Sequence, residues 1–476
     1  MSGSVHAVGS TSGSGVDCGG AVQALSQRNS TGRVYSTRVL FFALHLLACA
    51  SPGQPTGVIV ISMDTLRADR LGALGNPRGL TPNLDRFAAE GITFTAAYAQ
   101  SNETLFSHAS LFTSRMASDL APLDRMFRFP ARGPSLADSF QRGGWDTAAF
   151  VAGGHLSAVF GFNAGYDTYD DSASFGSLRE TAASALTWLD RRASGPFFLF
   201  LHGYDTHDRF LKPTPFGYAF ADPESRTAGA QLARTTGATS DIVGGRHSPN
   251  PDRIWALSVA HPRFERGRGI ATADPESRAL GPEDVEHLVD VYDGSVAWAD
   301  ACFGLFMAEL EDRGLLDEVV IVVLSDHGEE LGEKGVFNHH YSLSDAVTRV
   351  PLLVRLPGGK GGGARVDEVV ELLDVAPTLL ELAGLPALPS AAGASLVPAF
   401  ATPGWTGRGV ARSEGELRLL SVRARLGRLT AEGLRVENPH AAALLEVAPI
   451  DGVSLRLDGE TDEGPALRTA LVELAR

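Results

Sequence analysis

The chain has little cysteine, little positive charge and no apolar run long enough to cross a bilayer. Three cysteines in 476 residues, Cys18, Cys49 and Cys302, are too few for a disulfide framework. The formal net charge of −15 at pH 7 argues against nonspecific nucleic-acid binding, which needs a basic surface. The apolar run Val39 to Ala50 falls short of the roughly 20 residues that a transmembrane helix needs. Because 44% of the residues are hydrophobic, the chain can still form a large globular core.

The N-terminal residues have the features of a leader. Residues 1–32 are rich in Gly and Ser, so they are either disordered or upstream of the true start. The short apolar run follows Arg33 and Arg38, as in the hydrophobic part of a secretory signal. The segment ending in Cys49, LLAC, is similar to a bacterial lipobox, in which the cysteine is lipidated. The alternatives are an ordinary cleaved signal and an uncleaved anchor. We expect residues 1–57 to be leader and linker, and the rest of the chain to be exported.

Three apolar stretches predict the buried strands of a parallel sheet, at residues 58–62, 197–201 and 319–324. They show no alternation of polar and apolar residues, which is typical of strands covered on both faces. A long stretch at 283–313 repeats apolar residues at helical spacing. The sequence therefore predicts an α/β fold, in which a large mixed, mostly parallel β-sheet is flanked by helices within residues 58–400.

Acidic or imidazole side chains follow each of these predicted strands. They are Asp64 after the first strand, His202, Asp205 and His207 after the second, and Asp326 and His327 after the third. Ligands of open α/β sheets bind outside the carboxyl ends of the strands, where such side chains can converge. Carboxylate oxygen and imidazole nitrogen together suit a divalent metal. The alternatives are an Asp that caps the next helix and a His that hydrogen-bonds a loop carbonyl.

Thr104 lies where a predicted loop becomes a helix. The helix dipole and the free backbone N–H groups favour negative charge there, so a metal-held hydroxyl at this position would be an activated nucleophile. The alternative is that Thr104 is simply a helix cap, which is the commoner role of threonine at a helix start.

Four phrases, VISMDTLRADRLG, SHASLFTSR, SDHGEELGEKG and RVPLLVRLPG, occur in this order and resemble the sulfatase family of the alkaline phosphatase superfamily. The resemblance implies an alkaline-phosphatase-like fold and one divalent metal ion. The implied metal ligands are Asp64, Thr104, Asp326 and His327. Sulfatases proper carry a Cys or Ser that is oxidised to formylglycine at the nucleophile position, and threonine cannot be converted in this way. Threonine is the nucleophile in relatives that act on phosphorus.

The resemblance also implies further residues that bind the substrate or a second metal: His108, His202, Asp205, His207, His339 and His340. Among them, His207 is the preferred contact for the substrate anion, and Asp205 and His202 are weaker candidates. His339 is preferred to His340 as a metal ligand. Zn²⁺ or Mn²⁺ is expected rather than Ca²⁺ or Mg²⁺, because His327 supplies a nitrogen ligand.

Two regions fall outside the repeating pattern of strands and helices. Residues of about 211–280 lack sustained apolar periodicity and predict an insertion, either a substrate-shaping lid or an inert loop. Residues 401–476 predict a small C-terminal α+β subdomain that ends in a helix at 465–476. We also expect Thr81 to cap a helix, and Asp293 and Asp300 to face solvent or cap loops.

These patterns and the resemblance together predict an exported metal-dependent hydrolase that cleaves a phosphoester, a phosphonate or a sulfate ester through Thr104. The expected substrate is a small-molecule, lipid or glycan ester. We expect the protein to be attached to a membrane through the N-terminal lipid anchor. No nucleic-acid or protein partner is evident. The alternatives are a phosphoglycerol- or phosphoethanolamine-type transferase, a sulfuric ester hydrolase, and a non-catalytic binding protein that keeps the fold.

Overall fold

The computed structural model describes residues 55–120, 129, 134–173, 175–207, 212–227, 229–230, 242–244, 254–256, 278–333, 337–340, 342–402, 404–415, 419–424, 427–431 and 455–458. All of them belong to one compact unit, Gln54–Arg476. The predicted signal, Cys49, most of the predicted insertion and the predicted final helix lie outside the described residues. Within the described part, no helix is both long enough and apolar enough to cross a membrane.

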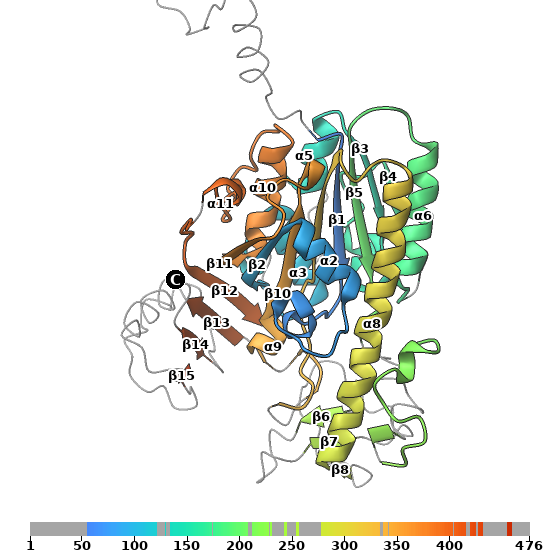
Figure 1. Ribbon diagram of the computed structural model, residues 1–476. Helices are drawn as coiled ribbons and strands as arrows, with labels where there is room; N and C mark the ends of the chain where they lie inside the picture. Colours follow the sequence, from blue (N-terminus) through green and yellow to red (C-terminus); the bar gives the residue numbers. More distant parts are fainter. Residues whose placement is uncertain are drawn as a thin grey trace, which may run out of the picture. The chain divides into compact units, whose positions relative to one another are not determined.

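An eight-stranded sheet forms the centre of the fold, in the order β11-β2-β10-β9-β1-β5-β3-β4 (Figure 1). Its strands are β1 (Gly57–Met63), β2 (Ile92–Tyr98), β3 (Asp146–Phe150), β4 (Thr168–Asp170), β5 (Phe197–Gly203), β9 (Val319–Leu324), β10 (Arg349–Arg355) and β11 (Ala364–Glu371). Neighbouring strands are parallel except at β10, which is antiparallel to both β9 and β2. The prediction of a mixed, mostly parallel sheet is confirmed.

The strands β9, β1 and β5 lie side by side, and every residue in them is buried. Ile59 on β1 pairs with Leu199 on β5 and with Ile321 on β9. Ser62 is paired with His202 and with Leu324, so the three strands end level with one another. The polar residues that follow them therefore leave the sheet at one edge.

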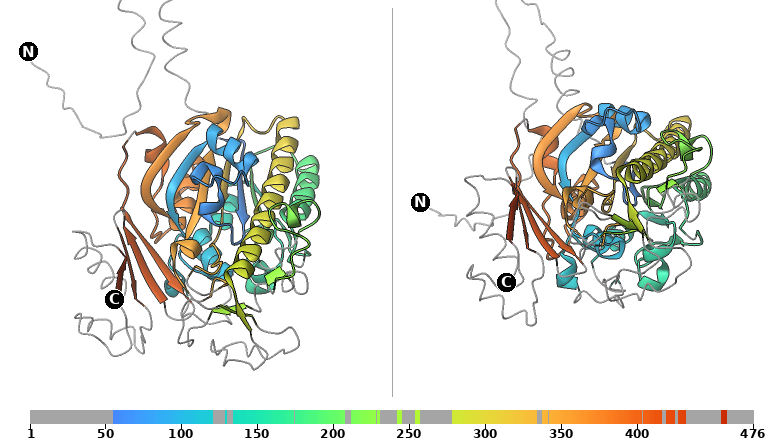
Figure 2. Two further views of the ribbon diagram at one scale, coloured as in Figure 1. Left: turned by 60° about the horizontal axis from the view of Figure 1, so that its bottom comes forward. Right: turned by 90° about the horizontal axis from the view of Figure 1, so that it is seen from below.

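Helices cover both faces of the sheet (Figure 2). One face packs against α2 (Pro82–Glu90), α6 (Leu178–Arg191) and α8 (Pro282–Asp312). The other packs against α3 (Thr104–Thr113), α5 (Leu136–Arg142), α10 (Val375–Leu382) and α11 (Val397–Ala401). Two short helices, α4 (Ala117–Leu120) and α9 (Asp345–Thr348), complete the α-helices described here. Alternate residues of β1 divide between the two faces, because Ile59 packs with the first set of helices and Val60 with the second.

Seven 3₁₀ turns connect these elements in the described part: η1 (Ala68–Arg70), η2 (Gly72–Leu74), η3 (Gly154–Leu156), η4 (Ala158–Phe160), η5 (Phe216–Tyr218), η6 (Pro357–Gly359) and η7 (Leu372–Asp374). Within the predicted insertion, β6 (Ile242–Gly244), β7 (Ile254–Ala256) and β8 (Arg278–Leu280) form a three-stranded antiparallel sheet.

The long helix α8 carries two buried acids that anchor other elements. Asp300 accepts hydrogen bonds from the backbone N–H groups of Asn83 (3.1 Å) and Leu84 (2.8 Å), so it caps α2. Thr81, the predicted cap, makes no side-chain cap hydrogen bond. Asp293 is fully buried and pairs with Arg78 at 2.5 Å. The expectation of a capping role is right for Asp300, whereas a solvent-facing position is wrong for both acids.

Within the predicted C-terminal subdomain, a four-stranded antiparallel sheet forms from β12 (Val410–Gly415), β13 (Leu419–Ala424), β14 (Gly427–Ala431) and β15 (Leu455–Asp458). Strand β12 also bonds to the segment that leads into α3. The Glu414 N–H donates to Gln100 O (2.8 Å), and the Ser413 hydroxyl donates to Ala99 O (2.6 Å). The domain boundary near residue 401 stays a prediction.

Candidate active site

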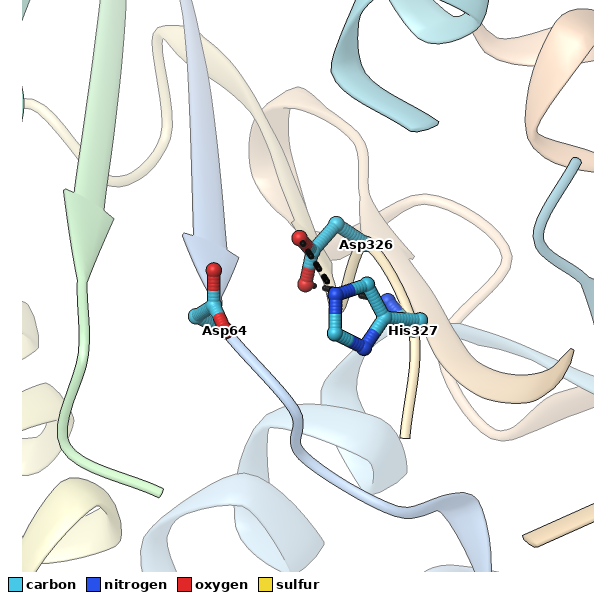
Figure 3. A group of neighbouring side chains, drawn as sticks. All are labelled: Asp64, Asp326 and His327. Atoms are coloured by element: carbon cyan, nitrogen blue, oxygen red, sulfur yellow. Dashed lines mark hydrogen bonds and ion pairs between the residues drawn. The ribbon is translucent and has the colours of Figure 1, made fainter. Parts of the chain in front are cut away.

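Three of the predicted metal ligands, Asp64, Asp326 and His327, meet at the level edge of the sheet, where β1 and β9 end (Figure 3). Their ligand atoms all lie within 4.8 Å of one another, and all three residues are completely buried. Two carboxylate oxygens, Asp64 Oδ1 and Asp326 Oδ2, have no hydrogen-bond partner. Buried carboxylates are unfavourable unless a cation or a donor offsets their charge. These residues therefore fit a divalent cation.

Thr104 joins this group from the start of α3. Its hydroxyl donates to Asp64 Oδ2 at 3.0 Å and lies 3.4 Å from His327 Nε2. The N-cap position belongs to Glu103, which makes no side-chain cap hydrogen bond, so Thr104 is not the cap. The Ser107 hydroxyl donates to Asp326 O at 2.6 Å and fixes α3 against the loop after β9. Four predicted residues from three distant segments thus come together.

The two carboxylates differ in proton affinity. Burial raises the pKa of Asp64, but the hydrogen bond from His202 and the nearby imidazoles of His207 and His327 outweigh burial and lower that pKa. Burial and the charge of Asp64 raise the pKa of Asp326 to about 6. Asp64 is therefore ionised, and its carboxylate accepts the hydrogen bond of the Thr104 hydroxyl.

His108 lies between the start of α3 and the end of β1, next to the site. One ring nitrogen, Nδ1, is 2.8 Å from Thr104 O, and the other, Nε2, is 3.0 Å from the Ser62 hydroxyl. Burial lowers the pKa of His108 to about 3, so the ring is neutral. Since the side chain is completely buried, the structure places His108 as a link between α3 and β1. Both ring nitrogens thus have protein partners, and the substrate contact of His108 stays a prediction.

The residues after β5 take different positions. His202 Nε2 lies 3.3 Å from Asp64 Oδ2, so His202 supports a candidate ligand. Asp205 Oδ2 accepts the backbone N–H of Leu178 at 2.6 Å, at the first residue of α6. The structure therefore does not bring Asp205 into the metal-binding group.

A row of imidazole rings extends from His327. The ring centroids of His327 and His339 are 4.5 Å apart, and those of His339 and His207 are 5.3 Å apart. His340 lies next to His339, with ring centroids 4.3 Å apart. Burial lowers the pKa of His339 well below its ordinary value, and the surrounding imidazoles add to this effect. His207, His339 and His340 are thus connected with the candidate ligand His327 through ring contacts, and their roles toward the substrate or a second metal stay predictions.

Sequence reasoning missed the side chains that hold this row. Asn102 Nδ2 donates to His339 O at 2.8 Å, and Glu103 Oε1 lies 2.7 Å from His340 Nδ1. Glu329 Oε2 lies 3.2 Å from His339 Nδ1. The available signal was position, because Asn102 and Glu103 directly precede Thr104.

Arg67 joins the loops that carry the candidate ligands. Its guanidinium donates to Glu329 O (3.0 Å), in the loop after β9, and pairs with Asp69 (2.7 Å), in the loop after β1. Burial raises the pKa of Asp69, but Arg67 outweighs burial and lowers that pKa. Arg67 therefore holds the loop after β1 and the loop after β9 together at the site.

The fold is an α/β fold with alkaline-phosphatase-like architecture, and its candidate metal site lies at the edge of the sheet. The phosphonate monoester hydrolase of Agrobacterium radiobacter has this fold: its structure superposes with a TM-score of 0.63 at 19% identity, covering 88% of this chain and 94% of that one. A family model described as Sulfatase matches residues 56–385. The chain belongs to the sulfatase family, and it is an ester hydrolase.

Two curated relatives differ in their named activities. The multifunctional alkaline phosphatase superfamily protein PehA of Trinickia caryophylli is 27% identical over 225 residues, which cover 46% of this chain and 40% of that protein. An N-acetylglucosamine-6-O-sulfatase of Bacteroides thetaiotaomicron is 24% identical over 424 residues, which cover 76% of this chain and 75% of that enzyme. Family membership alone leaves open which ester this chain cleaves.

Proposed function

We propose that this protein hydrolyses phosphate or phosphonate esters with Thr104 as the nucleophile. The observation that carries the proposal is the position of the Thr104 hydroxyl, 3.0 Å from Asp64 Oδ2 and 3.4 Å from His327 Nε2, at the start of a helix. Formylglycine, the nucleophile of sulfatases proper, cannot form from threonine. An unmodified hydroxyl in this place suits attack on phosphorus.

Asp64, Asp326, His327 and Thr104 would hold a divalent cation. The cation would act as a Lewis acid that lowers the pKa of the hydroxyl and offsets the charge of the ester. The mixture of carboxylate oxygen and imidazole nitrogen favours Zn²⁺ or Mn²⁺ over Ca²⁺ or Mg²⁺. His339, whose ring centroid lies 5.3 Å from that of His207, remains our candidate ligand for a second cation, without Asp205, and we assign His207 the role of acid.

Thr104 attacks phosphorus in line with the leaving oxygen. The bond from Oγ1 to phosphorus forms as the bond from phosphorus to the leaving oxygen breaks, and the hydroxyl proton passes to Asp64 Oδ2, which already accepts its hydrogen bond. The free N–H groups at the start of α3 stabilise the transferring anion. His207 protonates the leaving oxygen. Water then attacks phosphorus as the bond from phosphorus to Oγ1 breaks. The proton of the water passes to His207, and Asp64 returns its proton to Oγ1, which restores the Thr104 hydroxyl.

A sulfate ester is the second candidate substrate. It is favoured by the relative of Bacteroides thetaiotaomicron, which is described as an N-acetylglucosamine-6-O-sulfatase and matches 76% of this chain. A sulfated glycan would then be the substrate class. Transfer to an alcohol acceptor in place of water would use the same site.

Hydrolysis of four aryl esters tests the proposal: a phosphate monoester, a phosphate diester, a phosphonate ester and a sulfate ester, each with metal-loaded protein. We expect a phosphorus ester to be cleaved faster than the sulfate ester. Thr104→Val keeps the shape of the side chain and should abolish turnover, whereas Thr104→Ser should retain part of it. Full activity in Thr104→Val would exclude Thr104 as the nucleophile.

We further propose that the protein is exported and attached to a membrane by lipid on Cys49. The lipobox-like LLAC segment after a short apolar run supports this proposal. In the native host, Cys49→Ser should remove lipid labelling and release the protein from the membrane fraction. An unlabelled wild-type protein would contradict it.

A further inference from the structure

Phe175 is an exposed aromatic residue close to the site, and the mechanism above does not use it. Three large hydrophobic side chains of the described residues are strongly exposed, namely Val159, Phe175 and Leu305, and Phe175 alone is aromatic. The residue is 61% exposed. Its backbone has a φ of +50°, which bulky residues rarely adopt and which is most frequent at functional sites.

The surroundings of Phe175 hold it in place. The residue after it, Gly176, is buried, and its carbonyl accepts the N–H of Tyr204 at 3.0 Å. The N–H of Gly176 donates to Ala152 O at 3.3 Å. The ring centroid of Phe175 lies 5.0 Å from that of Tyr204 and 6.3 Å from that of His207. Phe175 is therefore fixed beside two site residues while most of the residue is exposed to solvent.

Two routes of direct contact connect Phe175 with the candidate metal ligands. In the first, His207 contacts His339, whose ring lies 4.5 Å from that of His327. In the second, the ring centroid of Tyr204 is 4.6 Å from that of His202, which bonds to Asp64. Phe175 thus lies at the edge of the site, next to the imidazole that we propose to protonate the leaving oxygen.

We propose that Phe175 is a specificity-determining residue, whose exposed ring stacks against a flat ring in the leaving group of the ester. This inference rests on the proposed function, because it assigns the leaving group to the His207 side of the site. A phenyl ring offers its face to another aromatic ring or to the apolar face of a sugar ring. The protein would then prefer esters of aromatic or sugar alcohols to esters of small alkyl alcohols.

Binding of inert or poorly cleaved probes tests this inference apart from turnover. Metal-loaded Thr104→Val protein, which should not turn these esters over, is titrated calorimetrically with phenyl phosphate, glucose 6-phosphate and methyl phosphate. We expect Phe175→Ala, added to this background, to weaken binding of at least one ring-bearing probe by about threefold to tenfold and to leave binding of methyl phosphate unchanged. The probe that is affected identifies the ring as aromatic or sugar. Phe175→Trp should keep the preference, and Leu305→Ala, an equally exposed position, should change nothing.

Several outcomes would overturn the inference: no binding, equal affinity for ring-bearing and methyl probes, or equal weakening of both by Phe175→Ala. Kinetics separate this failure from failure of the proposed function. If phosphorus esters are cleaved and Phe175→Ala does not change the ratio of kcat/KM for aryl and methyl esters, the inference alone fails. If no phosphorus ester is cleaved while ring-selective binding persists, the proposed function fails.

Discussion

Removing one charge from the buried carboxylate pair should stabilise the metal-free protein. Asp326 and Asp64 face each other without a full set of donors, and this environment raises the pKa of Asp326 from 3.8 to about 6. A shift of about two pKa units corresponds to about 3 kcal/mol. Because the folded-state pKa is raised, ionisation of Asp326 destabilises the folded protein relative to the unfolded chain. This loss of stability is absent below pH 3.8 and is complete once the pH has risen past about 6. Asp326→Asn should therefore raise the free energy of unfolding by about 3 kcal/mol at pH 7.

Urea denaturation of chelator-treated protein measures this effect. The advantage of Asp326→Asn over wild type should be present at pH 7 and should disappear near pH 4. Added Zn²⁺ or Mn²⁺ should reverse the order, because a cation at about 1,000 times its Kd stabilises the folded state by about 4 kcal/mol and the variant has lost a ligand. Asp205→Asn is the matched control, since that buried carboxylate bonds to Leu178, and its metal response should equal that of wild type. If metal-free Asp326→Asn is less stable than wild type at pH 7, the reasoning about charge conflict is refuted.

Three further substitutions test other parts of the account. Asp300→Ala removes the cap of α2 and should lower the free energy of unfolding by about 1–3 kcal/mol, measured by chemical denaturation. Asn102→Ala frees the loop that carries His339 and should lower kcat about tenfold with little change in melting temperature, while an unchanged kcat would exclude a positioning role. Asp69→Asn breaks the ion pair with Arg67 and should lower the melting temperature at pH 7. The melting temperatures of variant and wild type should converge as the pH falls through the lowered pKa of Asp69, whereas a constant difference between them at every pH would contradict an ion-pair origin.

The buried strands could be predicted from the sequence because their signal is local. Continuous apolar runs at 58–62, 197–201 and 319–324 became β1, β5 and β9, and the apolar periodicity at 283–313 became α8. Strand ends also located the candidate ligands, since parallel strands bring their carboxyl ends to one edge whatever the chain does between them.

Contacts between distant segments could not be read in this way. Thr81 is of a residue type that commonly caps helices and stands at the N-cap position. The cap of α2 is nevertheless supplied by Asp300, far along the chain. Asp205 follows a strand as Asp64 does, yet its carboxylate turns to a backbone N–H of α6, because side-chain direction after a strand depends on the packing of neighbouring helices. Phe175 gave no signal either, since its position beside His207 arises only in the folded chain.

Mass spectrometry of acid-quenched protein tests the central claim most directly. Metal-loaded enzyme is mixed with an excess of an aryl phosphate or phosphonate ester, quenched during turnover and digested. We predict that the peptide containing Thr104 carries one phosphoryl or phosphonyl group on that residue, and that Thr104→Val forms none. Turnover of the same ester with an unmodified Thr104 peptide at every quench time would contradict the account.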